Sequence, residues 1–431
     1  MKWSGWVLAL GAVACGSSDE ARDTSDTGGG ADAVADADGG GDVGPQDATD
    51  PTDPTLAPVG DFGWEGSECP SGTTLAEGPE DPNARWCVRA GGAVKHGPFG
   101  RWYGPEGSKA EGGEYSDDVA SGTWRTWYPG GSLSAEGERA AGGRSGTWTF
   151  WRADRTRESA GPFVADRPDG AWTWYWPGGA VQREGSYRAG AEEGSWQSYY
   201  PDGTDEELVT YAGGVREGAF AKAWPSGEDA ERGQYRDGLR SGEWTTWHDN
   251  GEMASRGSYV RDLQDGVWRF WDREGLASGE GPFADGVQQG TWSLWHWQQG
   301  ERVKMSGEVL TGLPHGRWVG THDPGGEPAG ELTYHFGSRE GPSRTIWKTG
   351  HTLSEGDYFY DLPQGPWKFY YPDGTLFIDA VYARGLLNGE YREYYQDGSP
   401  KAEGTYGGGL RIGVWTYWDE NGEMHTEGAE R

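Results

Sequence analysis

The feature that most constrains this chain is a short phrase, a glycine, any residue and an aromatic ring, which recurs fourteen times between residues 97 and 415. Ten of the thirteen spacings between successive copies are 24 residues. A fixed period of about 20 to 50 residues is typical of repeat architectures, in which each unit buries its apolar face against its neighbours. The anchor positions, of which only Ser343 lacks a ring, are Phe99, Trp124, Trp148, Trp172, Trp196, Phe220, Trp244, Trp268, Trp292, Trp318, Ser343, Trp367, Tyr391 and Trp415.

Each copy carries the local pattern of a β-hairpin. Residues 123–128 alternate in the manner of a strand, Pro129-Gly130-Gly131 turns the chain, and residues 133–139 return it. Alternation sends Trp124 to one face and Trp127 to the other. We therefore expect an all-β fold, an elongated single-layer antiparallel sheet of about 14 stacked hairpins.

Glycines recur within the expected return strands and favour close packing between units. They occur after a glutamate in Glu136-Gly137, Glu184-Gly185, Glu355-Gly356 and Glu403-Gly404. A missing side chain in mid-strand makes room for a ring from the neighbouring hairpin. We interpret these glycines as packing residues.

The composition favours a core built from rings. The chain has 77 glycines and 26 tryptophans, and 22 of these tryptophans lie in the repeat region. An aromatic side chain buries roughly 150 to 250 Å², so rings can stabilise a thin sheet that has no aliphatic interior.

The charge of the chain excludes several classes of partner. The formal net charge is −32, and the residues after position 95 still contain 52 acidic against 32 basic side chains. A nucleic-acid partner requires clustered positive charge, and anionic lipid headgroups attract lysine and arginine for the same reason. We expect no nucleic-acid binding.

The N-terminus resembles an export signal. Residues 1–15 combine Lys2, an apolar run and the sequence Ala12-Val13-Ala14-Cys15, which resembles a bacterial lipobox with Cys15 as the lipidated residue. This resemblance implies an exported lipoprotein, anchored by lipid in a membrane of the bacterial cell envelope, at the outer membrane or cell surface. The alternative is a simple secretory signal in which the cysteine is incidental.

Two further segments precede the repeats. Residues 16–61 lack aromatic side chains and are rich in Asp, Ala, Gly and Pro, a composition typical of a disordered tether. If Cys15 carries lipid, Cys69 and Cys87 remain as one pair, and we expect them to form a disulfide. We interpret residues 62–95 as a disulfide-stapled cap on the first repeat.

The repeated phrase as a whole resembles a known family. The pattern G-x-W-x-x-W-Y-x-x-G, followed by E-G-x-Y, is similar to the MORN repeat (membrane occupation and recognition nexus), in the bacterial variant found in YwqK-type antitoxin proteins. The resemblance extends over residues 96–428. It implies a sheet of stacked hairpins used for binding or scaffolding, and neutralisation of a toxin as one use.

Catalytic and metal-binding motifs are absent from the sequence. It contains no His-Glu-x-x-His, no phosphate-binding Walker loop and no Gly-x-Ser-x-Gly elbow. Glutamates such as Glu136 and Glu184 occupy equivalent places in their copies, whereas a catalytic pair would deviate from the repeat. We expect no enzyme activity, no cofactor and no metal.

One stretch departs from the regular pattern. Between Trp292 and Trp367 two spacings lengthen to 26 and 25, and Thr321 replaces the second ring of its copy. Five of the eight histidines lie there, namely His296, His315, His322, His335 and His351. Decay of a redundant repeat, a local bend and a partner-binding patch all fit this irregularity.

These observations leave three functions open. The first is a non-enzymatic surface-tethered scaffold that binds a protein partner through its rings and carboxylates. The second is binding of a glycan or cell-wall polysaccharide along the aromatic rows, and the third is an antitoxin or immunity role.

Overall fold

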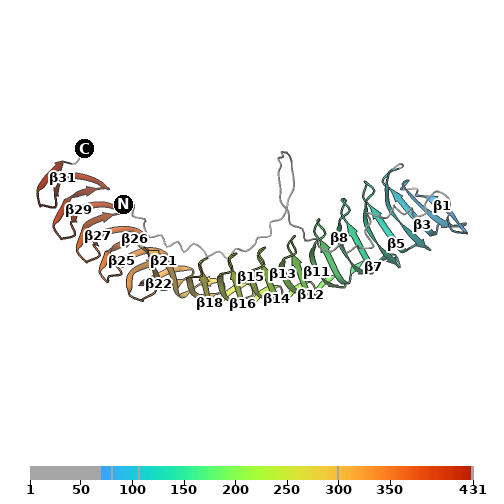
Figure 1. The fold of residues 1–431 in the computed structure, drawn as a ribbon, viewed down its shortest axis with the longest axis horizontal. Helices are drawn as coiled ribbons and strands as arrows, with labels where there is room; N and C mark the ends of the chain where they lie inside the picture. Colours follow the sequence, from blue (N-terminus) through green and yellow to red (C-terminus); the bar gives the residue numbers. More distant parts are fainter. Residues whose placement is uncertain (1–68, 79–80, 105–106, 299, 429–431) are drawn as a thin grey trace, which may run out of the picture. The chain divides into compact units, whose positions relative to one another are not determined.

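The structure, a computed structural model, describes residues 69–78, 81–104, 107–298 and 300–428. The chain divides into two units, 1–60 and 61–431, of which the first lies wholly outside the described residues. The expected signal, Cys15 and the tether of residues 16–61 therefore lie outside them as well. The described part contains no helix, and its strands form one open antiparallel sheet (Figure 1).

The strands pair in chain order, each with the strand before it and the strand after it (Figure 1). They are β1 (Thr73–Glu77), β2 (Ala84–Arg89), β3 (Lys95–Trp102), β4 (Lys109–Ser116), β5 (Val119–Trp127), β6 (Leu133–Ala140), β7 (Gly143–Trp151), β8 (Arg157–Val164), β9 (Arg167–Pro168), β10 (Gly170–Tyr175), β11 (Val181–Arg188), β12 (Ala191–Tyr199), β13 (Asp205–Ala212), β14 (Val215–Ala223), β15 (Asp229–Arg236), β16 (Leu239–Trp247), β17 (Met253–Val260), β18 (Leu263–Trp271), β19 (Ala277–Ala284), β20 (Val287–Gln288), β21 (Gly290–Gln298), β22 (Glu301–Leu310), β23 (Leu313–His322), β24 (Pro328–His335), β25 (Ser338–Ile346), β26 (Thr352–Phe359), β27 (Leu362–Tyr370), β28 (Leu376–Ala383), β29 (Leu386–Tyr394), β30 (Pro400–Gly407), β31 (Leu410–Trp418) and β32 (Met424–Gly428).

The expected all-β, single-layer sheet is confirmed. Two strands are interrupted, since β9 and β10 both pair with β8, and β20 and β21 both pair with β19. Each interruption faces a proline, Pro162 or Pro282, which has no amide N–H to donate to the ladder. With each interrupted pair taken as one strand, β3 to β32 form fourteen hairpins.

The two edges of the sheet carry different turns. At one edge a three-residue loop follows most of the strands that carry an anchor, whereas the loops after β3, β21 and β23 differ in length. In the loop after Tyr200, the Gly203 amide donates to the Tyr200 carbonyl (2.9 Å), and Gly203 has a φ of 88°. At the other edge the turns have two residues, and Ala141 and Gly142 both have positive φ (51° and 89°), as a type I′ turn requires. The sequence pattern predicts only the first kind of turn.

The first glycine of every phrase has a positive φ. It precedes the anchor by two residues, and its φ lies between 60° and 134° in all fourteen copies, for example 67° at Gly122. The pairing register shifts beside it, where Gly112 faces Arg125 but Glu114 faces Ser121. A bulge of this kind needs backbone angles that glycine adopts without steric cost, which explains why the glycine recurs.

The core is a row of anchor rings along one face of the sheet. The tryptophan anchors are between 0% and 5% exposed. Each lies against a glycine of the preceding strand, so a Cβ at Gly137 would stand 2.3 Å from the Trp148 ring. Most of the indoles also donate to a backbone carbonyl beside the bulge, as Trp148 does to Glu138 (2.9 Å). The packing role expected for the mid-strand glycines is confirmed.

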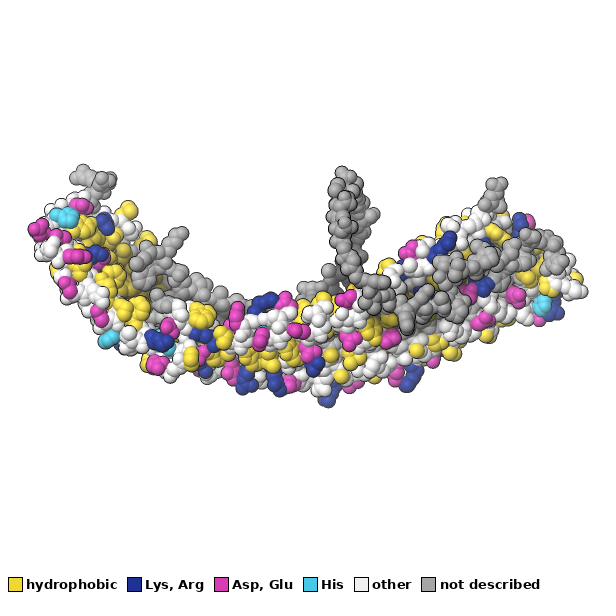
Figure 2. Space-filling view, in the orientation of Figure 1, with side chains coloured by type: hydrophobic (Ala, Val, Ile, Leu, Met, Phe, Trp, Pro, Cys, Tyr) yellow, Lys and Arg dark blue, Asp and Glu magenta, His cyan; other side chains and the backbone are white. Residues whose placement is uncertain are grey.

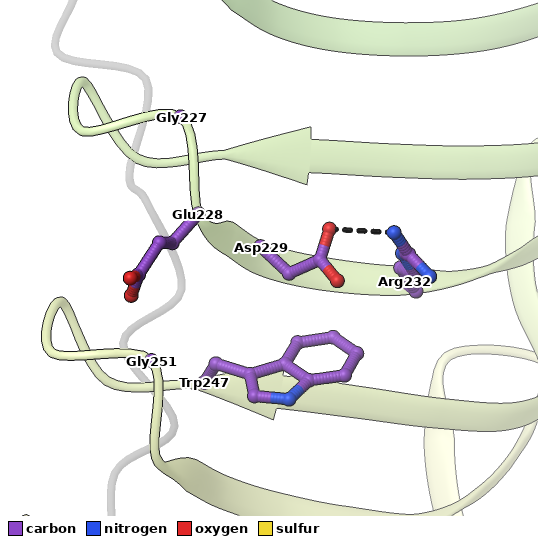
Figure 3. Close-up of a pocket in the computed structure, with 6 residues that line it drawn as sticks. All are labelled: Gly227, Glu228, Asp229, Arg232, Trp247 and Gly251. Atoms are coloured by element: carbon purple, nitrogen blue, oxygen red, sulfur yellow. Dashed lines mark hydrogen bonds and ion pairs between the residues drawn. The ribbon is translucent and has the colours of Figure 1, made fainter.

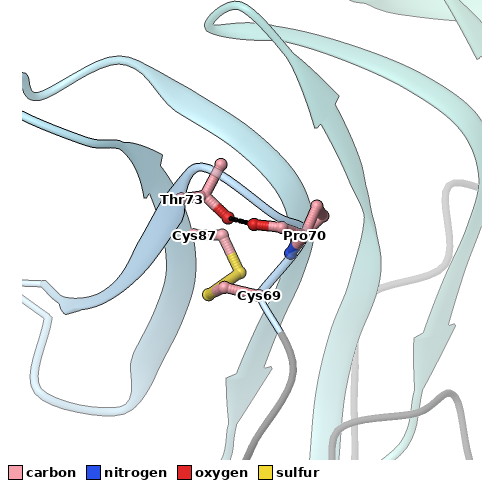
Figure 4. Close-up of a disulfide and its surroundings, with 4 residues drawn as sticks. All are labelled: Cys69, Pro70, Thr73 and Cys87. Carbon is pink, nitrogen blue, oxygen red and sulfur yellow. Dashed lines mark hydrogen bonds between the residues drawn. A yellow bond between two sulfur atoms is a disulfide. The ribbon is translucent and has the colours of Figure 1, made fainter.

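The hairpin β1–β2 continues the same sheet, because β2 pairs with β3. A disulfide joins Cys69 to Cys87 (Cα–Cα 5.5 Å), and Thr73 donates from its hydroxyl to the Pro70 carbonyl beside it (Figure 4). The bridge ties the residues before β1 to the middle of β2. The expected disulfide is therefore present.

Candidate functional site

The face opposite the anchors carries a second row of side chains, three residues after each anchor. We call these positions the outer row. Ring-bearing members of the outer row are half-buried, except Trp151, which is 8% exposed. The members are Trp102, Trp127, Trp151, Tyr175, Tyr199, Ala223, Trp247, Trp271, Trp295, Thr321, Ile346, Tyr370, Tyr394 and Trp418.

Charged side chains lie among the outer-row rings. Arg125 forms an ion pair with Glu136 on the facing strand, and Arg269 pairs with Glu280 at 3.1 Å. Two other glutamates accept a hydrogen bond from an outer-row tyrosine of the following strand, since Tyr199 donates to Glu184 (2.8 Å) and Tyr370 to Glu355 (2.7 Å). The recurrent glutamates thus have structural partners within the sheet.

These contacts shift the titration of two phenols. Burial, and then the hydrogen bond to Glu184, raises the pKa of Tyr199 to about 12. Burial, and then the hydrogen bond to Glu355, raises the pKa of Tyr370 to about 12 as well. Both phenols therefore remain protonated donors at neutral pH.

In ten hairpins the residue after the outer-row position joins one hairpin to the next. Its side chain donates to an outer-row backbone carbonyl of the following hairpin, as Tyr128 does to Trp151 (3.0 Å) and Tyr371 to Tyr394 (3.0 Å). We call this series the edge ladder. Its donors are Tyr103, Tyr128, Arg152, Trp176, Tyr200, Trp224, His248, Trp347, Tyr371 and Tyr395.

Asp272, which follows the outer-row Trp271 just before the irregular stretch, instead accepts hydrogen bonds from backbone amides of its own loop. Further on, β22 and β23 have ten residues each and are longer than their counterparts. His296 on β21 and His322 on β23 are the backbone partners of Val303 on β22, which is fully buried. Burial lowers the pKa of His296, so neutral imidazole is favoured there.

The other residues that the sequence singles out in this stretch, Ser343, His315 and His335, lie in two separate places. Ser343 occupies its anchor position and is 7% exposed, with Leu332 opposite it on β24. His315 and His335 lie together near a two-residue turn, with ring centroids 5.7 Å apart and Phe336 beside them. The five histidines therefore do not form one site.

Sequence reasoning missed a break in the outer row at Ala223. The signal was available, because Ala223 stands three residues after Phe220, where the flanking hairpins have Tyr199 and Trp247. On the neighbouring strand β13, Leu208 is 37% exposed, and its direct partner on β14 is Ala221. An apolar floor is thus left open between two rings, and we call these three residues, Leu208, Ala221 and Ala223, the ring gap.

A pocket of about 480 Å³ adjoins the ring gap (Figure 3). Asp229, the backbone partner of Ala223, lines the pocket and pairs with Arg232 at 2.7 Å. Trp247 forms one wall, and the side chain of Glu228 extends from the loop towards Gly251 (Figure 3). Its other lining residues are Gly227 and Gly251.

The surface view shows how these features lie along the sheet. Hydrophobic, acidic and basic side chains are interspersed along the visible face (Figure 2). Within the described ranges, no group of three or more His, Cys, Asp or Glu side chains is placed to hold a metal ion. None of the described segments forms a helix long and apolar enough to span a membrane.

Comparison with known proteins identifies the repeat unit. Four segments of the chain match the MORN repeat variant, namely residues 168–189, 240–261, 363–383 and 387–406. Each segment lies within the hairpin array. No curated protein matches the chain.

Two solved structures are similar to this chain over most of its length. The crystal structure of TcdB2-TccC3-Cdc42 shares 9% identity and covers 81% of this chain, with a TM-score of 0.14. The crystal structure of TcdB2-TccC3 without hypervariable C-terminal region shares 12% identity and covers 75%, also with a TM-score of 0.14. This chain spans only 20% and 19% of those chains, and the TM-scores are too low to support a conclusion about fold or function.

Proposed function

We propose that this protein is a non-enzymatic scaffold, tethered to the bacterial cell envelope, that binds a protein partner through the outer row. The observation that carries the proposal is that the outer-row rings other than Trp151 stay partly exposed, with no second layer over them among the described strands. Rings held in a rigid sheet offer large contact area at low entropic cost, which favours recognition.

Photo-crosslinking tests this proposal directly. A benzophenone amino acid placed at Tyr175 or Trp271 in the full chain, expressed in its host, should give discrete protein adducts. The matched control places it at Val164 or Val260, which are 59% and 54% exposed and lie near the two-residue turns. Equal adducts from both sets, or none from the outer row, would contradict the proposal.

Attachment to a membrane is the second part of the proposal. It rests on the lipobox-like sequence that ends at Cys15. Replacing Cys15 with serine should release the protein from the membrane fraction. Retention of this variant in that fraction would count against lipid anchoring.

Glycan or cell-wall binding is the alternative that the outer row also favours, because rings stand beside paired charges such as Arg125 and Glu136. A polysaccharide pulldown with Trp127→Ala tests it, and loss of binding without loss of fold supports this alternative. Trp151 is unsuitable for this test, since it is 8% exposed and its removal would disturb packing.

An antitoxin role rests on resemblance alone, through the four segments that match the MORN repeat variant. Its test is co-expression with the product of a neighbouring gene. A toxic product that this protein fails to neutralise would exclude the role for that pair.

A further inference from the structure

The ring gap is the place where the outer row has space for one more ring. Neighbouring outer-row positions are two strands apart, about 10 Å, so the absence of a ring at Ala223 leaves about 19 Å between Tyr199 and Trp247. Tyr199 is held in place by its hydrogen bond to Glu184 (2.8 Å). The gap therefore has at least one fixed wall, and its floor is the exposed side of Leu208.

The floor of the ring gap favours an aromatic side chain over a sugar. Leu208, Ala221 and Ala223 offer no side-chain hydrogen-bond donor or acceptor, whereas a sugar ring presents hydroxyl groups that require such partners. A phenyl or indole ring would cover Leu208 and complete the outer row. Aromatic anchors in pockets of this kind dominate the affinity of protein interfaces.

The adjoining pocket favours a cation beside that ring. The carboxylate of Glu228 forms no ion pair with the described part of the chain, and it lies against Gly251, where an added Cβ would stand 2.4 Å from Oε2. Trp247 supplies a ring wall, and the Arg232 guanidinium already lies over that ring, 5.9 Å from its centroid, so a ligand cation would be held chiefly by its ion pair with Glu228. Asp229 is already paired with Arg232, so Glu228 is the acidic group left for a ligand.

The charged residues around the ring gap also favour a basic ligand. Asp202, Asp205 and Glu206 lie on or next to β13, beside the floor of the gap. The basic Arg232, opposite Ala221 on β15, is paired with Asp229. The chain as a whole carries a net charge of −32, which favours a basic partner and accelerates its approach.

We infer that the ring gap and its pocket bind a basic protein segment, which inserts one aromatic side chain over Leu208 and one lysine or arginine beside Glu228. This inference rests on the proposed function and names the chemistry of the partner. It assigns a recognition role to the one regular hairpin whose outer-row ring is missing.

The test uses peptides of defined sequence and the variant Ala223→Trp, whose new side chain would fill the ring gap. Fluorescein-labelled peptides with the cores Lys-Trp-Lys, Lys-Ala-Lys and Glu-Trp-Glu are titrated into the protein at low salt, with anisotropy as the readout. Wild-type protein should bind the Lys-Trp-Lys peptide at least tenfold more tightly than the other two. Ala223→Trp should weaken that binding at least tenfold, because its own ring occupies the gap.

Matched variants distinguish the contribution of the apolar ring gap to peptide binding from that of the Glu228 charge. Ile346→Trp adds the same ring at an outer-row position in another hairpin and should leave binding unchanged. Leu208→Ser removes the floor without added bulk, and Glu228→Lys reverses the pocket charge, and both should weaken binding. Thermal unfolding of each variant establishes that it is folded.

Several results would overturn the inference. These are failure of the wild-type protein to bind the Lys-Trp-Lys peptide, equal binding of the Lys-Ala-Lys peptide, and unchanged binding by folded Ala223→Trp and Leu208→Ser. Binding of chitohexaose that Ala223→Trp abolishes would identify a sugar site in its place. If Ala223→Trp still crosslinks to a partner from Tyr175 and Trp271, the proposed function stands and only this inference fails.

Discussion

Val209 lies directly opposite Phe220, in the one hairpin whose anchor is a phenylalanine packed against a valine. In the ten hairpins with a tryptophan anchor, the strand before it presents a glycine to the ring. Ser343 has Leu332 opposite it, and Tyr391 has Ala380. In these thirteen hairpins the combined volume of the anchor and the residue opposite it is thus roughly conserved, as a close-packed core requires, whereas Phe99 of the first hairpin faces Trp86.

The pairing of tryptophan with glycine makes a measurable prediction. Gly257→Ala would place a Cβ 2.2 Å from the Trp268 ring, and we expect a loss of about 1 to 3 kcal/mol in local stability. Gly178→Ala is the matched control, since no atom lies within 4 Å of its Cβ. Hydrogen exchange in β17 and β18 measures the effect, and equal protection in the two variants would contradict the packing argument.

A compensating pair of changes should restore part of that stability. Trp268→Phe alone leaves a cavity, and Gly257→Val alone overfills the site, whereas together they reproduce the arrangement of Phe220 and Val209. We expect the double variant to be more stable than Gly257→Val alone, with a favourable coupling free energy in a double-mutant cycle. Additive losses would indicate that volume matching does not determine the pairing.

The edge ladder predicts a smaller and more local effect. Tyr371→Phe removes the hydrogen bond to the Tyr394 carbonyl (3.0 Å) and should cost about 1 kcal/mol. Tyr360→Phe, at a side chain that is 63% exposed, should cost almost nothing. Faster hydrogen exchange at the loop ends of β27 and β29 in the first variant alone would support the ladder.

The repeat pattern was enough to predict the hairpins, their number and the glycines beneath the rings, because each depends on local spacing. The edge ladder was not predicted, since its donors Tyr103, Arg152 and His248 share a position but no chemical type. The two-residue turns were missed because residues as different as Ala141 and Asp117 adopt positive φ there. The ring gap was not predicted because no motif marks it: Ala223 differs from its counterparts only in lacking a ring at an outer-row position.

Alkaline pH should weaken the sheet through its buried phenols. The folded pKa values of Tyr199 and Tyr370 are raised to about 12, above an unfolded value of about 10. Their contribution to stability is therefore fully present below pH 10 and is lost as the pH rises towards 12. Melting temperatures between pH 9 and 12 should fall less steeply in the double variant Tyr199→Phe and Tyr370→Phe, and an unchanged slope would contradict this assignment.

The pairing of every strand with its chain neighbours has a mechanical consequence. A pull on the two ends of the sheet acts across the backbone hydrogen bonds, so one hairpin can detach while the rest of the ladder stays intact. Each detached hairpin would release about 24 residues, or roughly 80 Å of extended chain. Under tension the protein should lengthen in steps and act as an extensible spacer, which single-molecule force spectroscopy would record as a regular sawtooth and a single rupture would refute.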